Sequence, residues 1–193
     1  MGMELESSRW LLEPTPETFG LGVKHEYWED VSSGRANNYY KYSLPDVAQV
    51  MGITTEGQVI VIGEFQPGLG KNYPHLIGET LEPGEEPLVA ARRGLQEETG
   101  YDTEELSLVS SVLQDSGRSD RLIHLVLAVN CRKVATGEAD IAVTLLNPLD
   151  FWANLTSYFL THPAEKHGAG NSLKLATLAF SQLGLLTLKG SVE

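Results

Sequence analysis

The stretch Glu85–Tyr101, which reads EEPLVAARRGLQEETGY, decides the fold of this 193-residue chain. It predicts a helix that begins near Glu86, because Pro87 is tolerated in a first helical turn. The helix should end at Gly100, since glycine suits the left-handed position that closes many helices. A buried stripe is expected at helical spacing i, i+3 and i+7, namely Leu88, Ala91 and Leu95.

Two carboxylates stand in the last turn of this helix. Glu97 and Glu98 lie at the negative end of the helix dipole, which disfavours anions there by roughly 0.3–1 kcal/mol each. Gly94 shares their face, because residues three and four apart are neighbours on a helix. The pair is either a solvated charged face or a site for a hard cation such as Mg²⁺ or Mn²⁺, which prefer oxygen ligands.

Composition narrows the class of protein. A length of 193 residues with 41% hydrophobic residues suits one soluble domain, and no apolar run is long enough to cross a membrane. The net charge of −12 argues against binding nucleic acid. The N-terminus lacks a basic region followed by an apolar one, so we expect no secretory signal and a cytoplasmic location. The lone Cys131 is expected in the core, and no metal-ligand spacing links the histidines, His25, His75, His124, His162 and His167.

Patterns of alternation place the expected strands. His25–Asp30 and Asn37–Leu44 suggest a hairpin, and Val47–Ile53 and Gln58–Phe65 suggest a pair in the middle of a sheet. The run VIVI at 59–62 should be buried on both faces. Further strands are expected at Leu106–Leu113, Leu122–Asn130 and Ile141–Leu146, and helices at Leu149–Leu160 and Ser172–Leu185.

Glycine and proline mark the expected loops. A loop that folds over a pocket is predicted from Pro67, Gly68, Gly70 and Pro74, and a flexible link between the last two helices from Gly168 and Gly170.

The central helix and its approach resemble the Nudix box, G-x5-E-x7-R-E-U-x-E-E-x-G-U, where U is apolar. Matching positions are held by Glu85, Arg93, Leu95, Glu97, Glu98, Gly100 and Tyr101. Gln58–Gly68 and Gly137–Leu149 resemble further parts of the ADP-ribose pyrophosphatase branch of that family. The resemblance covers roughly residues 45–185 and implies an α/β/α sandwich with a mixed sheet and a loop–helix–loop metal site. Residues 1–44 would then be N-terminal strands that form a homodimer interface, and 45–193 the Nudix-like domain.

Two positions of the box depart from the pattern. Glu79 replaces its opening glycine, and Gly94 replaces the glutamate after the arginine, which is often a metal ligand or the base. Gly94 weakens a helix by roughly 0.8–1.0 kcal/mol relative to alanine, with no evident structural benefit in the sequence. Upstream, Gln66 replaces an arginine that often grips the substrate, and His75–Gly78 stands where E-L-P-A is usual.

The resemblance assigns roles to the remaining candidates. Glu97 and Glu98 would bind Mg²⁺ or Mn²⁺ with the backbone carbonyl of Gly78, and Glu79 is a hypothetical replacement for the carboxylate missing at Gly94. The alternative for Glu79 is unrelated drift.

Catalysis and substrate binding involve a second group of residues. Glu98 and Glu138 are the catalytic candidates; Glu138 is either the base that takes a proton from water or an ordinary loop residue. Gln66 and Asp140 are the candidates for substrate binding. Glu85 and Arg93 should form a structural pair that fixes the box loop beside the capping Gly100.

Two functions follow from this sequence. The first is metal-dependent hydrolysis of the pyrophosphate in a nucleoside diphosphate compound, with ADP-ribose or an ADP-sugar as the preferred substrate. The second is a catalytically impaired Nudix module that binds a nucleotide-like ligand as a sensor or interaction domain. Gly94 and Gln66 favour the impaired module, whereas the retained Glu97 and Glu98 favour the enzyme.

Overall fold

The computed structural model describes residues 2–67, 69–161 and 166–185. Its contacts divide the chain into two compact units, residues 1–47 with 112–123, and residues 48–111 with 124–193. Gly68 and His162 lie outside the described residues, and the side chain of His167 is not described. No helix of the described residues is both long and apolar enough to cross a membrane.

The first unit is built on an antiparallel sheet with the strand order β1-β2-β3. The expected hairpin is confirmed as β2 (Gly22–Asp30) and β3 (Arg35–Ser43), which pair from Gly22 with Ser43 to Asp30 with Arg35. A short 3-10 helix, Pro16–Thr18, separates β2 from β1 (Met3–Leu12). The sequence did not predict β1, because every residue of this strand is exposed and no burial pattern marks it.

The second unit is built on a larger sheet, whose central order is β11-β5-β4-β10-β8. β6 joins β5, β7 joins β4 and β9 joins β10 at its margins. The strands are β4 (Val47–Thr54), β5 (Val59–Gln66), β6 (Lys71–His75), β7 (Ile77–Thr80), β8 (Tyr101–Asp102), β9 (Glu105–Leu113), β10 (Leu122–Lys133) and β11 (Ala142–Leu146). The predicted central pair, β4 and β5, is therefore confirmed.

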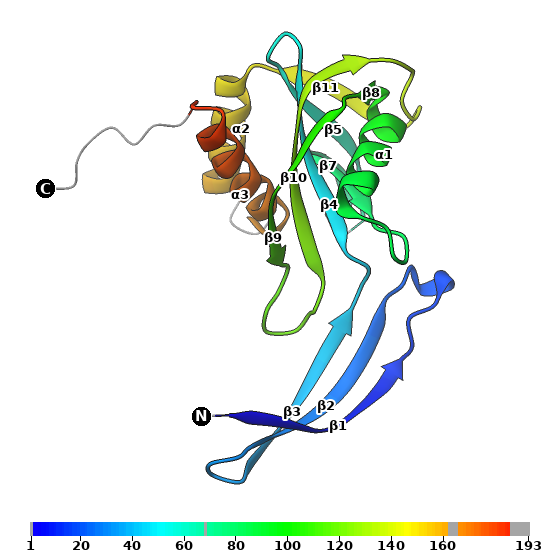
Figure 1. The fold of residues 1–193 in the computed structure, drawn as a ribbon, viewed down its shortest axis with the longest axis vertical. Coiled ribbons are helices and arrows are strands. Elements are labelled where there is room, and N and C mark those ends of the chain that lie inside the picture. The colour runs from blue at the N-terminus through cyan, green and yellow to red at the C-terminus, as the bar shows by residue number, and fades with distance from the viewer. Residues whose placement is uncertain (1, 68, 162–165, 186–193) are drawn as a thin grey trace, which may run out of the picture. The chain divides into compact units, whose positions relative to one another are not determined.

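Helices cover both faces of this sheet, which gives the predicted α/β/α sandwich. α1 (Pro87–Thr99) lies on one face, and α2 (Pro148–Thr161) and α3 (Lys166–Gln182) lie on the other (Figure 1). Residues of a strand alternate between faces. Ile60 and Ile62 of β5 accordingly join the core under α1, whereas Val61 faces a cavity beside α2.

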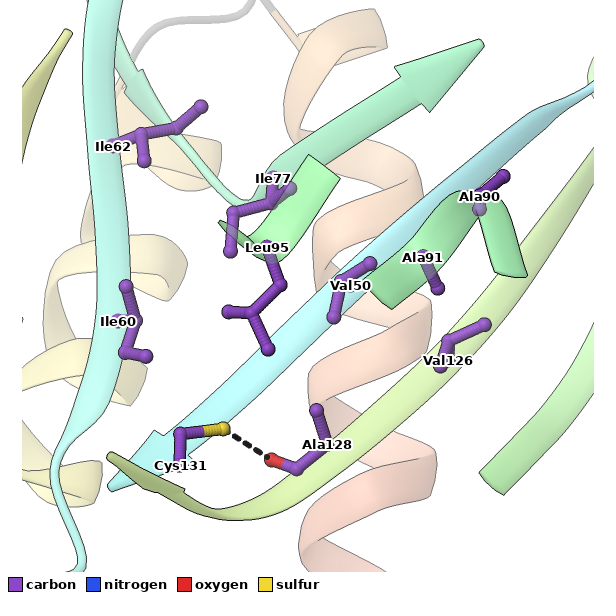
Figure 2. Packing of buried hydrophobic residues seen from close by; sticks show 11 residues of the cluster. Val50, Ile60, Ile62, Ile77, Ala90, Ala91, Leu95, Val126, Ala128 and Cys131 are labelled. Carbon is purple, nitrogen blue, oxygen red and sulfur yellow. Dashed lines mark hydrogen bonds between the residues drawn. The ribbon is translucent and has the colours of Figure 1, made fainter. Parts of the chain in front are cut away.

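The core under α1 is a cluster of aliphatic side chains from β4, β5, β7 and β10 (Figure 2). Ala91 and Leu95 of α1 are fully buried in it, as expected. Leu88 is 38% exposed, so its place in the predicted stripe is wrong; Ala90 and Gly94 are buried instead. Cys131 is in this core as predicted, and burial raises the pKa of its thiol to about 11.

The predicted loop is confirmed at Pro67 and Gly70, which lie in the turn between β5 and β6, but it is wrong at Pro74. The predicted link at Gly168 and Gly170 is also wrong. Pro74 lies inside β6, and its neighbours there are held by pairing with β5, which leaves no free loop at that point. Gly168 and Gly170 lie inside α3. Glycine is a poor helix former, but tertiary packing commonly overrides such a weak preference.

Candidate functional site

The C-terminal end of α1 is closed by glycine and by the chain that follows β10. Gly100 has a φ of +69° and donates its N–H to the carbonyl of Gln96. A side chain at Gly100 would lie 2.2 Å from the carbonyl oxygen of Ala135, and one at Gly137 would lie 2.4 Å from that of Glu98. Both glycines therefore let the 134–138 segment pack directly against the end of the helix.

Polar groups of this segment satisfy the carbonyls at the end of α1. The N–H of Glu138 donates to the carbonyl of Glu97 at 3.0 Å, and Lys133 Nζ donates to that of Thr99 at 2.5 Å. The Lys133 ammonium is thus a positive charge at the negative end of the helix dipole, where cations are favoured. It offsets part of the repulsion between the carboxylates of the last turn and the helix dipole, while the hydrogen bond from Glu138 to Glu97 holds the backbone of Glu138 at this end of α1.

Arg93 fixes the loop before α1. Its guanidinium binds Glu85 through two nitrogens, with Nη2 2.9 Å from Oε2 and Nε 3.2 Å from Oε1. Its Nη1 lies 2.7 Å from Glu79 Oε1, and its Nη2 also donates to the carbonyl of Thr80 at 3.1 Å. Glu97 reaches the same guanidinium only at 3.9 Å. The structure thus forms the expected pair of Glu85 and Arg93 and adds Glu79 to it.

Glu98 is the most perturbed carboxyl group of the site. Its Oε2 is buried and makes no hydrogen bond to the described residues. The pKa of Glu98 is raised to about 8, from an ordinary value of 4.5. Burial is the largest cause, and the charges of four other carboxylates, which are Glu79, Glu64, Glu138 and Glu97, contribute to the same shift. Five carboxylates therefore act on one region, and none of the causes that shift Glu98 is a cation.

Glu79 approaches this region from β7. Its side chain is only 16% exposed, and burial raises the pKa of its carboxyl group, although Arg93 opposes that shift. It lies against Gly94: a Cβ added there would be 2.7 Å from the Cβ of Glu79 and 3.0 Å from its Oε2. Gly94 thus has a structural benefit that the sequence did not reveal, because it makes room for Glu79.

Glu64 belongs to the site, and the sequence analysis missed it. Glu64 and Gln66 follow Ile62 at spacing two on β5, so they continue the strand face that packs under α1. Gln66 Nε2 lies 2.9 Å from Glu64 Oε1 and 3.0 Å from His75 Nε2. His75 Nε2 is also 3.1 Å from Glu64 Oε1, and its Nδ1 lies 2.8 Å from the carbonyl oxygen of Leu76. The alternation of β5 was the signal that could have found Glu64.

The other predicted site residues are more exposed than Glu79 and Glu98. Glu97 is 56% exposed, Gly78 is exposed on β7, and a side chain at Gly78 would meet nothing within 4 Å. Glu138 is exposed, with its charge acting on Glu98. Asp140 is also exposed, but it is not among the groups that shift the pKa of Glu98. The structure therefore brings Glu138 to the cluster, whereas no contact of Asp140 with the cluster is seen among the described residues.

The donors fit a divalent cation in chemical type, although not as a finished cage. All are oxygen donors, and the buried, unpaired Oε2 of Glu98 is a position where a cation would satisfy an otherwise costly charge. Among the described residues, however, no group of three or more His, Cys, Asp or Glu side chains is close enough to hold a metal. Arg93 holds Glu79, and Gln66 with His75 holds Glu64. Each of these two carboxylates thus already has a partner, and in Glu79 the bond to Nη1 of Arg93 engages Oε1.

A cavity of about 350 Å³ lies beside α2. Its walls are mainly apolar and include Val61, Tyr73, His75, Leu146, Phe151 and Ser172. His75 lies on this wall and also contacts Glu64, so one residue joins the cavity to the carboxylate cluster.

Comparison with known proteins shows local sequence similarity to two pyrophosphatases and to an activator protein. An ADP-ribose pyrophosphatase of Bacillus subtilis (strain 168) is 33% identical over 104 residues, 53% of this chain and 56% of that protein. A methanol dehydrogenase activator of Bacillus methanolicus is 34% identical over 89 residues, 46% and 48% of the two chains. An ADP-sugar pyrophosphatase of Mus musculus is 37% identical over 68 residues, 35% and 31%. The matches thus span about half or less of each relative.

The fold and a family model agree with these similarities. The crystal structure of an ADP compounds hydrolase superposes with a TM-score of 0.75 at 14% identity, covering 96% of this chain and 98% of that one. The family model described as the NUDIX domain matches residues 44–163, which is more than half of the chain. The loop–helix–loop that carries Glu85, Arg93 and Glu98 lies within that match, and the chain therefore belongs to the Nudix family.

Proposed function

We propose that this protein is a pyrophosphohydrolase that cleaves a nucleoside diphosphate linked to another group, with ADP-ribose or an ADP-sugar as its substrate. The observation that carries the proposal is Glu98, whose Oε2 is buried without a hydrogen-bond partner among the described residues and whose pKa is raised by burial and by the charges of four other carboxylates. Such a concentration of negative charge is costly unless a cation binds there. The similarity to the ADP-ribose pyrophosphatase of Bacillus subtilis and the ADP-sugar pyrophosphatase of Mus musculus supports the substrate class.

Glu98 and Glu97 would hold Mg²⁺ or Mn²⁺, with the backbone carbonyl of Gly78 as a further oxygen donor. The cation would supply Lewis-acid chemistry, which neutralises charge on the diphosphate and is worth several kcal/mol. The ion pair of Arg93 and Glu85 keeps the loop before α1 in place. The direct packing of Gly137 on the end of α1 does the same for the segment that carries Glu138.

Glu138 would be the general base. Its backbone N–H is fixed by the carbonyl of Glu97, while its side chain is exposed and can reach a water molecule. It would take a proton as that water attacks one phosphorus and the bond from that phosphorus to the bridging oxygen breaks. The products would be two phosphate monoesters. Gln66, at the end of β5, and Asp140, in the exposed loop before β11, would contact the substrate.

We also propose a homodimer through the N-terminal strands. β1 to β3 expose several large apolar side chains, among them Leu5, Leu11, Tyr39 and Tyr40. Contiguous exposed apolar surface commonly marks an interface. Light scattering of the full chain should give twice the mass of the monomer, and a monomer at every concentration would refute this part of the proposal.

The activity is tested with the purified full chain and a panel of ADP-ribose, ADP-sugars and other nucleoside diphosphate compounds. Monophosphate release is followed with Mg²⁺, with Mn²⁺ and with a chelator. We expect release that needs the metal and that falls by about 10²-fold or more in Glu98→Gln. Glu104→Gln is the matched control, because Glu104 is a glutamate of the same unit that is 82% exposed and bound only to Arg92.

Two outcomes would contradict the enzyme. Nucleotide binding without release would favour the impaired module, for which Gly94 and Gln66 are the specific observations. Release that is equally fast with a chelator, or unchanged in Glu98→Gln, would remove Glu98 from the chemistry.

A further inference from the structure

Glu79 and Gly94 occupy the same space in this molecule. The side chain of Glu79 leaves β7 and lies where a side chain on residue 94 would begin, with its Cβ 2.7 Å from the ideal Cβ position. Real Cβ atoms essentially never approach one another so closely, and the Cβ of Glu79 cannot move without its backbone. A side chain at position 94 and the glutamate at position 79 therefore exclude each other.

The carboxylate of Glu79 is directed by its neighbours. Arg93 Nη1 lies 2.7 Å from Oε1, while Oε2 lies 3.0 Å from the ideal Cβ position of residue 94. Gly94 is one helical turn before Glu98, so both residues share a face of α1. Oε2 of Glu79 is thus presented at the helix face that carries Glu98, and after burial the charge of Glu79 has the largest effect on Glu98.

We propose that Glu79 supplies to the cation site the carboxylate that a glutamate at position 94 would otherwise supply. This inference rests on the proposed metal-dependent function and concerns the residues by which this chain performs it. The donor comes from β7 instead of α1, and Gly94 is kept small so that it can enter. Arg93 is the positioning residue, since it holds one oxygen of Glu79 and is itself held by Glu85.

A purely structural role is the competing explanation. In that case Glu79 would serve only as a partner of Arg93. Glu85 already binds two nitrogens of that guanidinium, and Thr80 accepts from it as well. A structural role would affect folding stability and leave cation affinity unchanged, so the two explanations are separable by measurement.

The test is a cycle of variants of the full chain, with Mn²⁺ as the probe and calorimetric titration as the readout. The variants are Glu79→Gln, Glu79→Gly, Gly94→Glu and the double variant Glu79→Gly/Gly94→Glu. Glu79→Gln keeps the size of the side chain and an oxygen for Arg93 but removes the charge. We expect it to weaken Mn²⁺ binding by about tenfold, because affinity follows the number of charged ligands. Glu104→Gln, the remote control, should bind as the native protein does.

The double variant tests whether a carboxylate at position 94 can replace the one at position 79. Moving the carboxylate from position 79 to 94 should restore Mn²⁺ affinity to within about threefold of the native value, a much smaller loss than that of Glu79→Gly. Gly94→Glu alone should lower the melting temperature, since its side chain collides with Glu79. Melting curves and circular dichroism of every variant show whether it is folded. If Gly94→Glu does not fold, Glu79→Gln still tests the inference.

Three outcomes would overturn the inference. The first is native Mn²⁺ affinity in Glu79→Gln, and the second is a double variant that binds no better than Glu79→Gly. If Glu98→Gln loses Mn²⁺ while Glu79→Gln keeps it, the proposed function stands and only the exchange fails. The third is a native protein that binds no Mn²⁺, which would refute the exchange and the proposed metal-dependent function together.

Discussion

Carboxylates gather at two places along α1, and their pKa values are shifted in opposite directions. Near its middle, Arg92 binds Asp102 through Nε at 2.8 Å and Nη2 at 2.9 Å, and it binds Glu104 through Nη2 at 2.6 Å. Those hydrogen bonds hold the pKa of Asp102 below its usual range. At its C-terminal end, the pKa of Glu98 is instead raised to about 8 by burial and by other carboxylates.

The difference shows where negative charge is balanced within the chain and where it is not. Asp102 and Glu104 each meet the fork of a guanidinium, which matches carboxylate geometry. The charges that shift the pKa of Glu98 are those of other acids, and its Oε2 has no partner among the described residues. Arg93, which follows Arg92 on α1, binds Glu85 and Glu79 instead of Glu98. The charges of the first grouping are therefore neutralised within the chain, and the second grouping is the one for which we propose a cation.

The largest expected effect is on the stability of the metal-free protein at alkaline pH. The folded-state pKa of Glu98 is raised above 4.5, so the folded protein keeps a proton that the unfolded chain releases. Between pH 4.5 and 8, this linkage should progressively lower the free energy of unfolding, in total by roughly 2–4 kcal/mol. Glu98→Gln should therefore match the native protein at pH 4.5 and exceed it in stability at pH 8, as measured by urea unfolding.

Adding Mn²⁺ at pH 8 sharpens this comparison. A cation that binds the folded carboxylate should stabilise the native protein and leave Glu98→Gln almost unchanged. Equal stability of the two metal-free proteins at pH 8 would show that Glu98 carries no electrostatic strain.

A smaller effect is expected from Gly94→Ala. The added methyl group should destabilise the native protein by about 1–2 kcal/mol, because it meets Glu79 in a packed region. In the Glu79→Gly background the collision is gone, and the same change should stabilise by about 0.8–1.0 kcal/mol through helix propensity. Chemical unfolding of the four proteins gives both values. If alanine has the same effect in both backgrounds, the contact between residues 79 and 94 carries no energy.

The smallest effect is expected in the balanced grouping. Asp102→Asn should cost about 0.5–1 kcal/mol at pH 7, because Arg92 remains partly exposed and keeps Glu104. The folded pKa of Asp102 is depressed, so its contribution is present above the unfolded pKa and is lost as the pH falls through the folded value. Unfolding curves at pH 7 and pH 2.5 measure this loss. A gain in stability from Asp102→Asn at pH 7 would show that the charge of Asp102, like that of Glu98, destabilises the folded protein.

Local patterns in the sequence were sufficient for most elements of the second unit. The run at 59–62 was buried on both faces as predicted, since a continuous apolar strand has no polar side to expose. Gly100 closed α1 in the left-handed region, which few other residues adopt. Four strands, β1, β6, β7 and β8, were missed, because an exposed strand and strands of two to five residues leave no clear periodicity.

The sequence by itself determined the helix that carries Glu97 and Glu98, the sheet strands beside it and the family pattern of the loop before it. Only the tertiary structure decided how the charges are matched. It placed Lys133 at the end of α1 and Glu79 in the space left by Gly94. Secondary structure follows from neighbours a few residues apart, whereas these contacts join segments 15 to 34 residues apart and exist only once the sheet and helix have packed.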